Sequence, residues 1–445
     1  MDIIVYNLNE KDFDIIKSKL TAISLLNEIK KEINNKTTKP FIKIKNIPIG
    51  YDIINEFKKA NITPLSKSIK RKTSDNNTYD ISFIFNLDNN LLITGNGFDL
   101  EHNLKTKYTH FLNIFPEKEV ISKRKLSPQK IKLNGNEYFP SNNRLLSLLL
   151  YKYHNKLLQN YNWIDIETEL KNIINLIEKI DTNHFINKEY FPNREYSKED
   201  YKKLKEILDE ANTIYPNEFI HDFIPIYENA YDCIYYNKYS HNEILNTLEK
   251  NLDELINMLK DYLTEEVRKL STDSCSKDIL DIDYKITHVL NFNYTDTFRQ
   301  LYSDIDNNKI DFIHGSLNRN NLVLGINETL TEDMQNKVVN TVYFKKYFQR
   351  IYKKTDYKYI DWLNHVEFNT VYIHGHSLDE SDKEILEKII NSVLKKDTST
   401  VKIFYYDEKH YRQEVTNLIK VLGKDVFQKY YFQNKIIFIK QTPKK

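Results

Sequence analysis

A turn with two glycines, placed directly after an apolar segment, is the residue pattern in this chain with the clearest chemistry. Residues 91–94 are apolar or small, and they run into Gly95-Asn96-Gly97-Phe98-Asp99. Such a turn between a strand and a helix brings backbone amides close to a phosphate. The chain has eight glycines, and two of them stand here, where glycine tolerates a strained backbone. The turn points to a nucleotide ligand, although the full dinucleotide fingerprint has a third glycine where this chain has Leu100.

Three later apolar segments also end in polar residues. These ends are Asn291-Phe292-Asn293-Tyr294-Thr295-Asp296, His314-Gly315-Ser316 and His374-Gly375-His376-Ser377-Leu378-Asp379. Ligands of parallel sheets bind at the carboxyl ends of the strands, so we expect these segments and the glycine turn to surround one site.

The elements that position these residues are short apolar strands that alternate with amphipathic helices. This alternation is typical of an α/β fold with a parallel sheet and helices on both faces, as in Rossmann-like proteins. Strands are expected at residues 91–94, 286–292, 310–313, 322–324, 371–373, 401–406 and 436–439. Helices are expected at 385–394 and 411–422, the second of them ended by Gly423.

The organisation of the chain follows from where this alternation begins and ends. Residues 145–270 show apolar residues at helical spacing and almost no strand signal. Residues 1–80 suggest strands at 3–6 and 41–47 and helices at 11–33 and 51–60, and the polar segment 67–79 suggests a linker. We therefore expect a small α/β domain of unknown role over 1–80, a nucleotide-binding domain over 86–140 and 285–445, and a large helical insertion over 141–284.

Composition excludes several classes of protein. Sixty-five Lys and Arg against sixty-three Asp and Glu leave a net charge of +2, which gives no strong signal for a nucleic-acid partner. Two cysteines, Cys233 and Cys275, are too few for a disulfide framework or a four-cysteine zinc site. The sequence has no apolar run of about 18 residues and no signal peptide, so we expect a cytoplasmic protein without a membrane partner.

The polar strand ends, together with segments between them, resemble the bacteriophage abortive-infection AbiH family. The resemblance runs over about residues 88–440 and leaves out the first eighty residues. Its remaining motifs are Tyr108, Phe111-Leu112 and Trp163-Ile164-Asp165-Ile166-Glu167. The ordered combination is far more specific than any single motif.

That family is in turn similar to the sirtuin-like NAD-binding fold of phage-defence effectors, and this similarity implies roles for individual residues. Asn293 would contact the ribose and the reactive carbon, and His314 would be the base. The motif acid is replaced by Thr295, so Asp296 is the implied acidic partner and the identity of that partner is open. The residues implied to bind the cofactor are Gly95, Asn96, Gly97, Phe98, Asp99, Tyr294, Gly375, His376, Ser377 and Asp379.

The resemblance implies an NAD glycohydrolase in phage defence, which cleaves NAD to nicotinamide and ADP-ribose. Such an enzyme would need no prosthetic group and no metal. Its substrate or ligand would be NAD or a related nucleotide, and a phage-derived molecule would be its trigger. A sirtuin deacetylase is disfavoured because the four zinc-binding cysteines are missing. The leucines spaced over 245–263 suit a core and also a homo-oligomer interface.

Two alternative functions remain open on the sequence. One is a nucleotide-binding sensor that hydrolyses nothing, and the other is a metal-dependent nuclease or phosphoesterase suggested by His374 and His376. The same residues also suit structural roles: the glycines in a tight turn, Asn293 at a strand end, and Asp99 at a helix start. His374 and His376 compete with His314 for the role of base.

Overall fold

The computed structural model describes most of the chain, in two compact units. It describes residues 2–6, 28–32, 41–48, 63–64, 69–72, 78–86, 89–115, 130–139, 142–158, 164–182, 199, 202, 206, 226–229, 234–237, 241–303, 305–326 and 341–443. The first unit comprises Met1–Asn103, Leu270–Ile313 and Asp356–Lys445, and the second comprises Leu104–Lys269 and His314–Thr355. The domain boundaries expected from the sequence stay a prediction.

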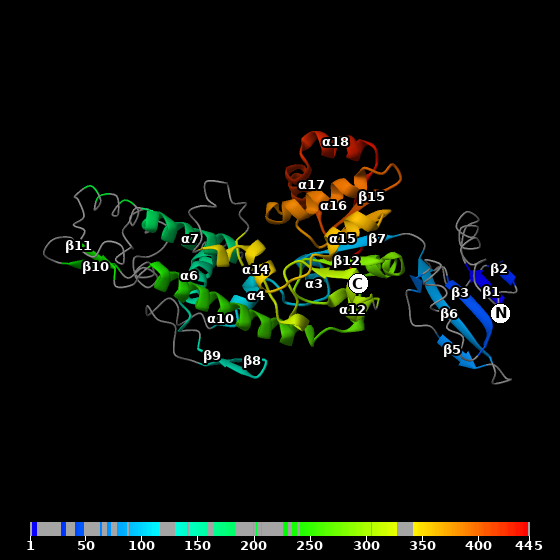
Figure 1. Cartoon of the computed structure of the whole chain (residues 1–445), viewed down its shortest axis with the longest axis horizontal. Helices are drawn as coiled ribbons and strands as arrows, with labels where there is room; N and C mark the ends of the chain where they lie inside the picture. Colours follow the sequence, from blue (N-terminus) through cyan, green and yellow to red (C-terminus); the bar gives the residue numbers. More distant parts are fainter. Residues whose placement is uncertain are drawn as a thin grey trace. The chain divides into compact units, whose positions relative to one another are not determined.

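The first unit contains the predicted parallel sheet, which confirms the α/β class (Figure 1). Its strands are β7 (Asn90–Thr94), β12 (His288–Asn291), β13 (Ile310–Phe312), β14 (Thr370–His374), β15 (Thr400–Tyr405) and β16 (Ile436–Lys440). They lie in the order β13-β12-β7-β14-β15-β16, and every neighbouring pair is parallel. The chain therefore adds β12 and β13 on one side of β7. It then returns to the other side of β7, where it adds β14, β15 and β16 in order.

Helices cover both faces of this sheet, as the alternating residues of β7 demonstrate. Leu91 and Ile93 share a buried cluster with α15 (Lys358–His365), α16 (Lys383–Leu394), α17 (Glu408–Leu422) and α18 (Lys424–Phe432). Leu92 points to the other face and shares a second cluster with α3 (Asn96–Glu101), α11 (Lys277–Leu280) and α12 (Thr297–Leu301). A strand buried on both faces is what a near-continuous apolar run predicts.

One helix boundary of the first unit matches the sequence pattern closely. Helix α17 ends at Gly423, which has φ of 82°, as expected. Short 3-10 turns complete the unit: η2 (Thr272–Ser274), η3 (Asp283–Lys285), η4 (Asn307–Lys309) and η7 (Glu380–Asp382).

The N-terminal residues of the first unit form a separate six-stranded sheet. Its strands are β1 (Asp2–Tyr6), β2 (Glu28–Glu32), β3 (Phe41–Pro48), β4 (Thr63–Pro64), β5 (Ile69–Lys72) and β6 (Thr78–Asn86). The predicted strands at 3–6 and 41–47 are confirmed. The predicted helix over 11–33 is wrong at its end, where β2 pairs with β1, and residues 51–60 lie outside the described part of the chain.

The predicted linker over 67–79 is also wrong, because it contains β5 and the start of β6. Among the described strands, β5 pairs with β6 alone, so it lies at an edge of this sheet. An edge strand tolerates charged residues, because it needs backbone pairing more than an apolar face. Because this segment is polar, the sequence pattern gave no sign of strand β5.

The second unit is built mainly from helices. They are α4 (Tyr108–Leu112), α6 (Arg144–Leu158), α7 (Ile166–Thr182), α10 (His241–Val267) and α14 (Lys346–Tyr352), with 3-10 turns η5 (Leu317–Arg319) and η6 (Val342–Phe344). The leucines of α10 at 245, 248, 252, 255, 259 and 263 are all buried, so this stripe is core. Residues 322–324 are buried but irregular, so the predicted strand there is wrong.

Two hairpins also belong to the second unit. Strands β8 (Ile131–Leu133) and β9 (Asn136–Tyr138) pair, as do β10 (Ile226–Asn229) and β11 (Ile234–Asn237). The expectation of almost no strand in 145–270 is therefore wrong over β10 and β11. Among the described helices, none is long and apolar enough to cross a membrane.

Candidate functional site

The register of the central strands brings three polar strand ends to one edge of the sheet. Asn291, the last residue of β12, pairs with Thr94, the last residue of β7. His374, the last residue of β14, pairs with the same Thr94. The residues that follow these three strands therefore start at the same level of the sheet. The fourth predicted end, at His314, belongs to the second unit.

Glycines allow the loops after β7 and β14 to cross in contact. The Gly95 N–H donates to the His374 carbonyl oxygen at 3.3 Å, and the Gly97 N–H donates to that of Gly375 at 2.7 Å. A Cβ atom on Gly95 would lie 2.6 Å from His376 Cα, and one on Gly97 would lie 2.8 Å from Gly375 Cα. The close approach of the two backbones explains these glycines, and two amides of the turn already have carbonyl partners. Ligand contact by Gly95 and Gly97 stays a prediction.

Two asparagines fix the loop after β12 against the loop after β7. The Asn293 side-chain amide donates to the Gly95 carbonyl oxygen at 2.8 Å, so the predicted ribose-orienting residue lies beside the glycine turn. The Oδ1 atom of Asn291 accepts from the Asn293 N–H at 2.8 Å and from the Thr94 hydroxyl at 3.0 Å. Asn291 also donates to the Thr295 carbonyl oxygen at 2.7 Å. Sequence reasoning missed this role of Asn291, although a polar residue ending an apolar strand is a usable signal.

Asp99 is an almost fully buried acid of this region. Its carboxylate accepts from the Thr295 hydroxyl at 2.5 Å and from the Thr297 hydroxyl at 2.7 Å, and only 1% of the residue is exposed. Burial raises the pKa of Asp99 to about 6, against the opposing effect of bonds from Thr295, Thr297 and Asn293. Thr295 stands where the resemblance implies an acid, and its hydroxyl donates to the carboxylate of Asp99 in α3. A second acid at that position would repel Asp99.

The other predicted residues of these two loops have defined neighbours. Asp296 is 5% exposed and accepts from Arg299 Nε at 2.7 Å, so the implied acidic partner is in an ion pair. Phe98 is a core residue, with its ring 5.5 Å from that of His374. Asn96 is exposed, and Tyr294 is half-buried.

His374 is a fully buried, neutral histidine. Its exposed fraction is 0%, and burial lowers its pKa to about 3. Its Nε2 atom lies 3.2 Å from a carboxylate oxygen of Glu101, and its ring packs against that of Phe404. Such burial suits a structural histidine better than a base that must exchange protons with solvent.

His376 is also held inside the loop after β14. Its Nδ1 atom accepts from the Leu378 N–H at 2.9 Å, and its Nε2 atom lies 3.5 Å from an Asp382 carboxylate oxygen. Its ring meets that of Phe292 edge-on at 4.4 Å. The bond to Nδ1 leaves the proton of a neutral imidazole on Nε2, facing Asp382.

Ser377 and Asp379 are exposed, and each has a local structural role. The Asp379 carboxylate accepts from the Ser381 N–H at 3.0 Å and so caps η7. The Ser377 carbonyl oxygen accepts from the Asn417 side chain at 2.8 Å. Their contact with a cofactor stays a prediction.

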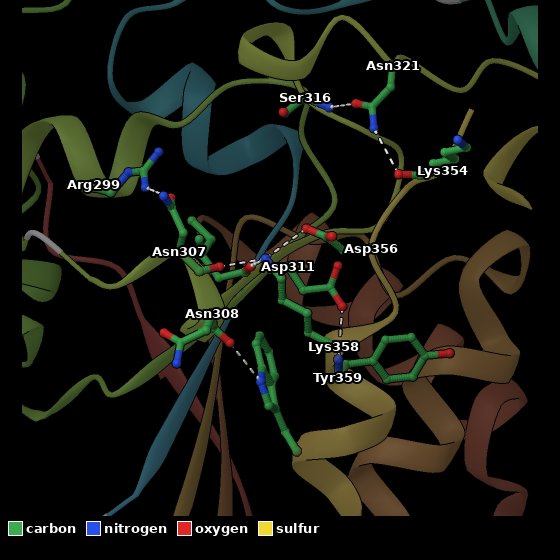
Figure 2. A network of polar contacts seen from close by, with 12 residues as sticks. Arg299, Asn307, Asn308, Asp311, Ser316, Asn321, Lys354, Asp356, Lys358 and Tyr359 are labelled. Carbon is green, nitrogen blue, oxygen red and sulfur yellow. Dashed lines mark hydrogen bonds and ion pairs between the residues drawn. The ribbon is translucent and has the colours of Figure 1, made fainter. Parts of the chain in front are cut away.

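Another buried acid, Asp311 in β13, was missed by the sequence reasoning (Figure 2). It is 0% exposed, burial raises its pKa to about 6, and it accepts from the Tyr359 N–H at 2.9 Å. The neighbouring Lys358 donates to the Ile310 carbonyl oxygen at 2.9 Å and pairs with Asp356 at 2.8 Å. Asp311 thus satisfies an amide in the first turn of α15 and attaches that helix to the sheet edge.

In the second unit, His314 lies in a turn that is held by Asn321. The Asn321 Oδ1 atom accepts from the Ser316 N–H at 3.0 Å, and a Cβ atom on Gly315 would lie 2.0 Å from the Asn321 carbonyl oxygen. His314 is 8% exposed, and its Nδ1 atom lies 3.4 Å from a guanidinium nitrogen of Arg350. Nothing in the sequence around Arg350 signals this contact.

The motif that begins at Trp163 has a structural function in its described part, and Trp163 itself lies outside the described residues. Asp165 accepts from the Glu167 N–H at 3.0 Å at the start of α7. Glu167 forms an ion pair with Lys346 at 2.7 Å. Among the described residues, no group of three or more His, Cys, Asp or Glu side chains is arranged to hold a metal ion.

Comparison with known proteins gives one clear match. The family model described as bacteriophage abortive infection AbiH matches residues 91–405, which include the glycine turn, the Asn291–Asp296 segment and the loop after β14. No curated protein and no solved structure matches the chain. The family match covers well over half of the 445 residues. The chain therefore belongs to the AbiH family of bacteriophage abortive-infection proteins.

Proposed function

We propose that this abortive-infection protein acts on NAD or a closely related nucleotide and breaks the bond between nicotinamide and ribose. The strand order carries the proposal. Numbered along the chain from β7 to β16, the strands lie in the order 3-2-1-4-5-6, which is that of the dinucleotide-binding Rossmann fold. Such folds bind the ligand where the order reverses, and in this chain the reversal lies between β7 and β14, where the glycine loops cross.

The chemistry at this position suits an N-glycosidic bond. Water replaces nicotinamide at the ribose C1′ atom: the carbon–nitrogen bond breaks, a carbon–oxygen bond forms, and one proton is released. The transition state resembles an oxocarbenium ion, which polar and anionic groups nearby stabilise. Asn293 is fixed by Gly95 and Asn291, so it would orient a ribose hydroxyl without adding charge. Asp99, with a pKa of about 6, supplies a negative charge next to Asn293 at neutral pH.

A second candidate, a nucleotide sensor without turnover, is favoured by the surroundings of His314. The implied base has its Nδ1 atom directed at the Arg350 guanidinium. A nitrogen that accepts a bond from a guanidinium does not accept a proton from water at the same time. Under this alternative, the strand-end loops would bind NAD or ADP-ribose and change shape or assembly without chemistry.

Nicotinamide release from NAD by the purified full-length protein tests the proposal. The reaction is followed by liquid chromatography, with and without extract of phage-infected cells as the source of a trigger. We expect release by the wild type and its loss in Asn293→Ala. Asn369→Ala is the matched control, because Asn369 is exposed and precedes β14, at the opposite edge of the same sheet.

Two other outcomes have definite meanings. Binding of NAD or ADP-ribose that requires Asn293, with no nicotinamide released under either condition, would favour the sensor. Absence of both binding and release would overturn the assignment of a nucleotide to this sheet.

A further inference from the structure

Strand β16 is an edge of the central sheet, and among the described strands it pairs with β15 alone. The Lys435 carbonyl oxygen accepts from an N–H group of β15 at 2.7 Å, and the Gln441 N–H donates to a carbonyl oxygen of β15 at 2.8 Å. Backbone groups of successive residues point to opposite edges of a strand, so the odd-numbered residues of β16 bond to β15. The N–H and C=O groups of Phe438 and Lys440 therefore point to the outer side.

The opposite edge of the same sheet lies against a helix. Strand β13 has three residues, and the Ile310 carbonyl oxygen accepts from Lys358 Nζ at 2.9 Å (Figure 2). The Trp362 side chain donates to the Asn308 carbonyl oxygen at 3.1 Å, so α15 lies along that edge. Strand β16 has five residues, of which the apolar ones are 436–439. An apolar edge strand of this kind is a template for pairing with a strand of another chain.

Aromatic side chains extend the apolar surface from β16 to α18. Phe432, the last residue of α18, is 77% exposed, and its ring lies 5.9 Å from that of Tyr431. The Tyr431 ring stacks on the Phe427 ring at 5.6 Å. Phe427 belongs to the buried cluster that contains Ile436, and Phe438 packs against the same cluster. Exposed apolar surface that continues in this way typically marks a contact with another protein.

We propose that the outer edge of β16 pairs antiparallel with β16 of a second copy of this chain and so forms a homodimer. A twofold contact must be self-complementary, and this edge meets that requirement. Phe438 of each copy would exchange both backbone hydrogen bonds with Lys440 of the other. The same register places Ile439 opposite Ile439 of the second copy, and cross-strand pairs of β-branched residues stabilise a sheet.

The side chains and charges of the edge also suit a second copy. Side chains alternate between the two faces of a strand, so Phe438 and Lys440 lie on one face. In the paired strands, the Lys440 ammonium of one copy would lie next to the Phe438 ring of the other, a favourable cation–π arrangement. The whole chain has a net charge of +2, so two copies repel each other only weakly. This contact does not depend on the cleavage of NAD.

Sedimentation velocity of the full-length protein over about 1–100 µM tests the dimer. We expect a species of twice the mass of the chain that increases with concentration. Amide hydrogen exchange at the two ends of this range tests the pairing. The Phe438 and Lys440 amides should be protected only at high concentration, whereas the Ile437 and Ile439 amides, which point to β15, should be protected at both. A monomer throughout the range would overturn the proposal, and so would a dimer whose Phe438 and Lys440 amides exchange equally fast at both ends.

Two substitutions at exposed positions should each weaken the dimer about tenfold or more. Lys440→Pro removes an outward N–H and no bond to β15, and edge strands tolerate proline at such a position. Phe432→Asp places a charge on the aromatic surface and decides the question if the proline variant does not fold. Ile360→Asp is the matched control, because Ile360 is an exposed apolar residue of α15, at the opposite edge of the sheet. Equal weakening by Ile360→Asp, or wild-type association of Phe432→Asp, would contradict the proposal.

These results separate the dimer from the proposed enzyme. A dimer that requires Lys440 and Phe432 but releases no nicotinamide would leave this inference standing and remove the hydrolase. Nicotinamide release by a protein that is monomeric over the whole range would do the reverse.

Discussion

Replacing Asp99 with asparagine should remove a pH dependence of stability that the wild type owes to one buried acid. Burial raises the pKa of Asp99 from 3.8 to about 6, so between these two values the folded state holds more protons than the unfolded state. The free energy of unfolding therefore falls as the pH rises through this window and levels off above about 6. At about 1.4 kcal/mol per pH unit, the wild type loses about 3 kcal/mol on account of this group.

The substitution Asp99→Asn suits the geometry around the buried group. The amide keeps the shape of the carboxylate, and a threonine hydroxyl can both donate and accept, so Thr295 and Thr297 can bond its oxygen and its nitrogen. The amide does not titrate, so the free energy of unfolding of Asp99→Asn does not show the fall with pH that the carboxyl group causes in the wild type. We expect the free energy of unfolding of Asp99→Asn, relative to that of the wild type, to rise by about 2 kcal/mol between about pH 4 and pH 7.

Urea unfolding followed by circular dichroism, at a series of pH values from about 4 to 8, measures this difference. Asp281→Asn is the control, because Asp281 is exposed on the same unit, and its stability should run parallel to that of the wild type. Parallel curves for Asp99→Asn and the wild type through the window would refute the reasoning about the buried carboxyl group.

Two further predictions concern the crossing loops and the β8–β9 hairpin. Gly375→Ala should cost about 3 kcal/mol or more, because φ is 67° and the new Cβ atom would lie 2.0 Å from the Phe98 nitrogen. Gly135→Ala, where φ is 83° but no atom lies within 4 Å, should cost only about 1 kcal/mol, and equal losses in thermal unfolding would contradict the argument. Asp261→Ala removes acceptors for Asn136 at 2.7 Å and for Tyr138 at 2.6 Å, so amide hydrogen exchange over 131–138 should become faster; an unchanged rate there would show that α10 does not hold the hairpin.

The central sheet was predictable because its strands are short apolar runs with helices between them. Leu91 to Ile93 face apolar clusters on both sides, and a continuous apolar run records such burial directly in the sequence. The ends of these strands were predictable for the same reason, since polar residues follow where burial stops.

Pairings between distant residues were not predictable from spacing. The partner of Asp311 is a backbone amide 48 residues away, and that of His314 is a guanidinium 36 residues away. Neither Tyr359 nor Arg350 differs in type from many other residues of the chain. The close approach of the two loops at the glycines could not be told from a ligand-binding turn in the sequence, because an approach to another backbone and an approach to a phosphate require the same residue.

The contact between β7 and β14 also determines when this protein can finish folding. Thr370 donates its N–H to the Asn90 side chain across a separation of 280 residues, and these two strands are the middle of the sheet. At a synthesis rate of about 5–20 residues per second, β7 leaves the ribosome tens of seconds before its neighbour β14 has been synthesised. A chain that ends before β14 therefore lacks the junction of the two loops, and a cell that makes this protein has that sheet edge only after Gly375 has been translated.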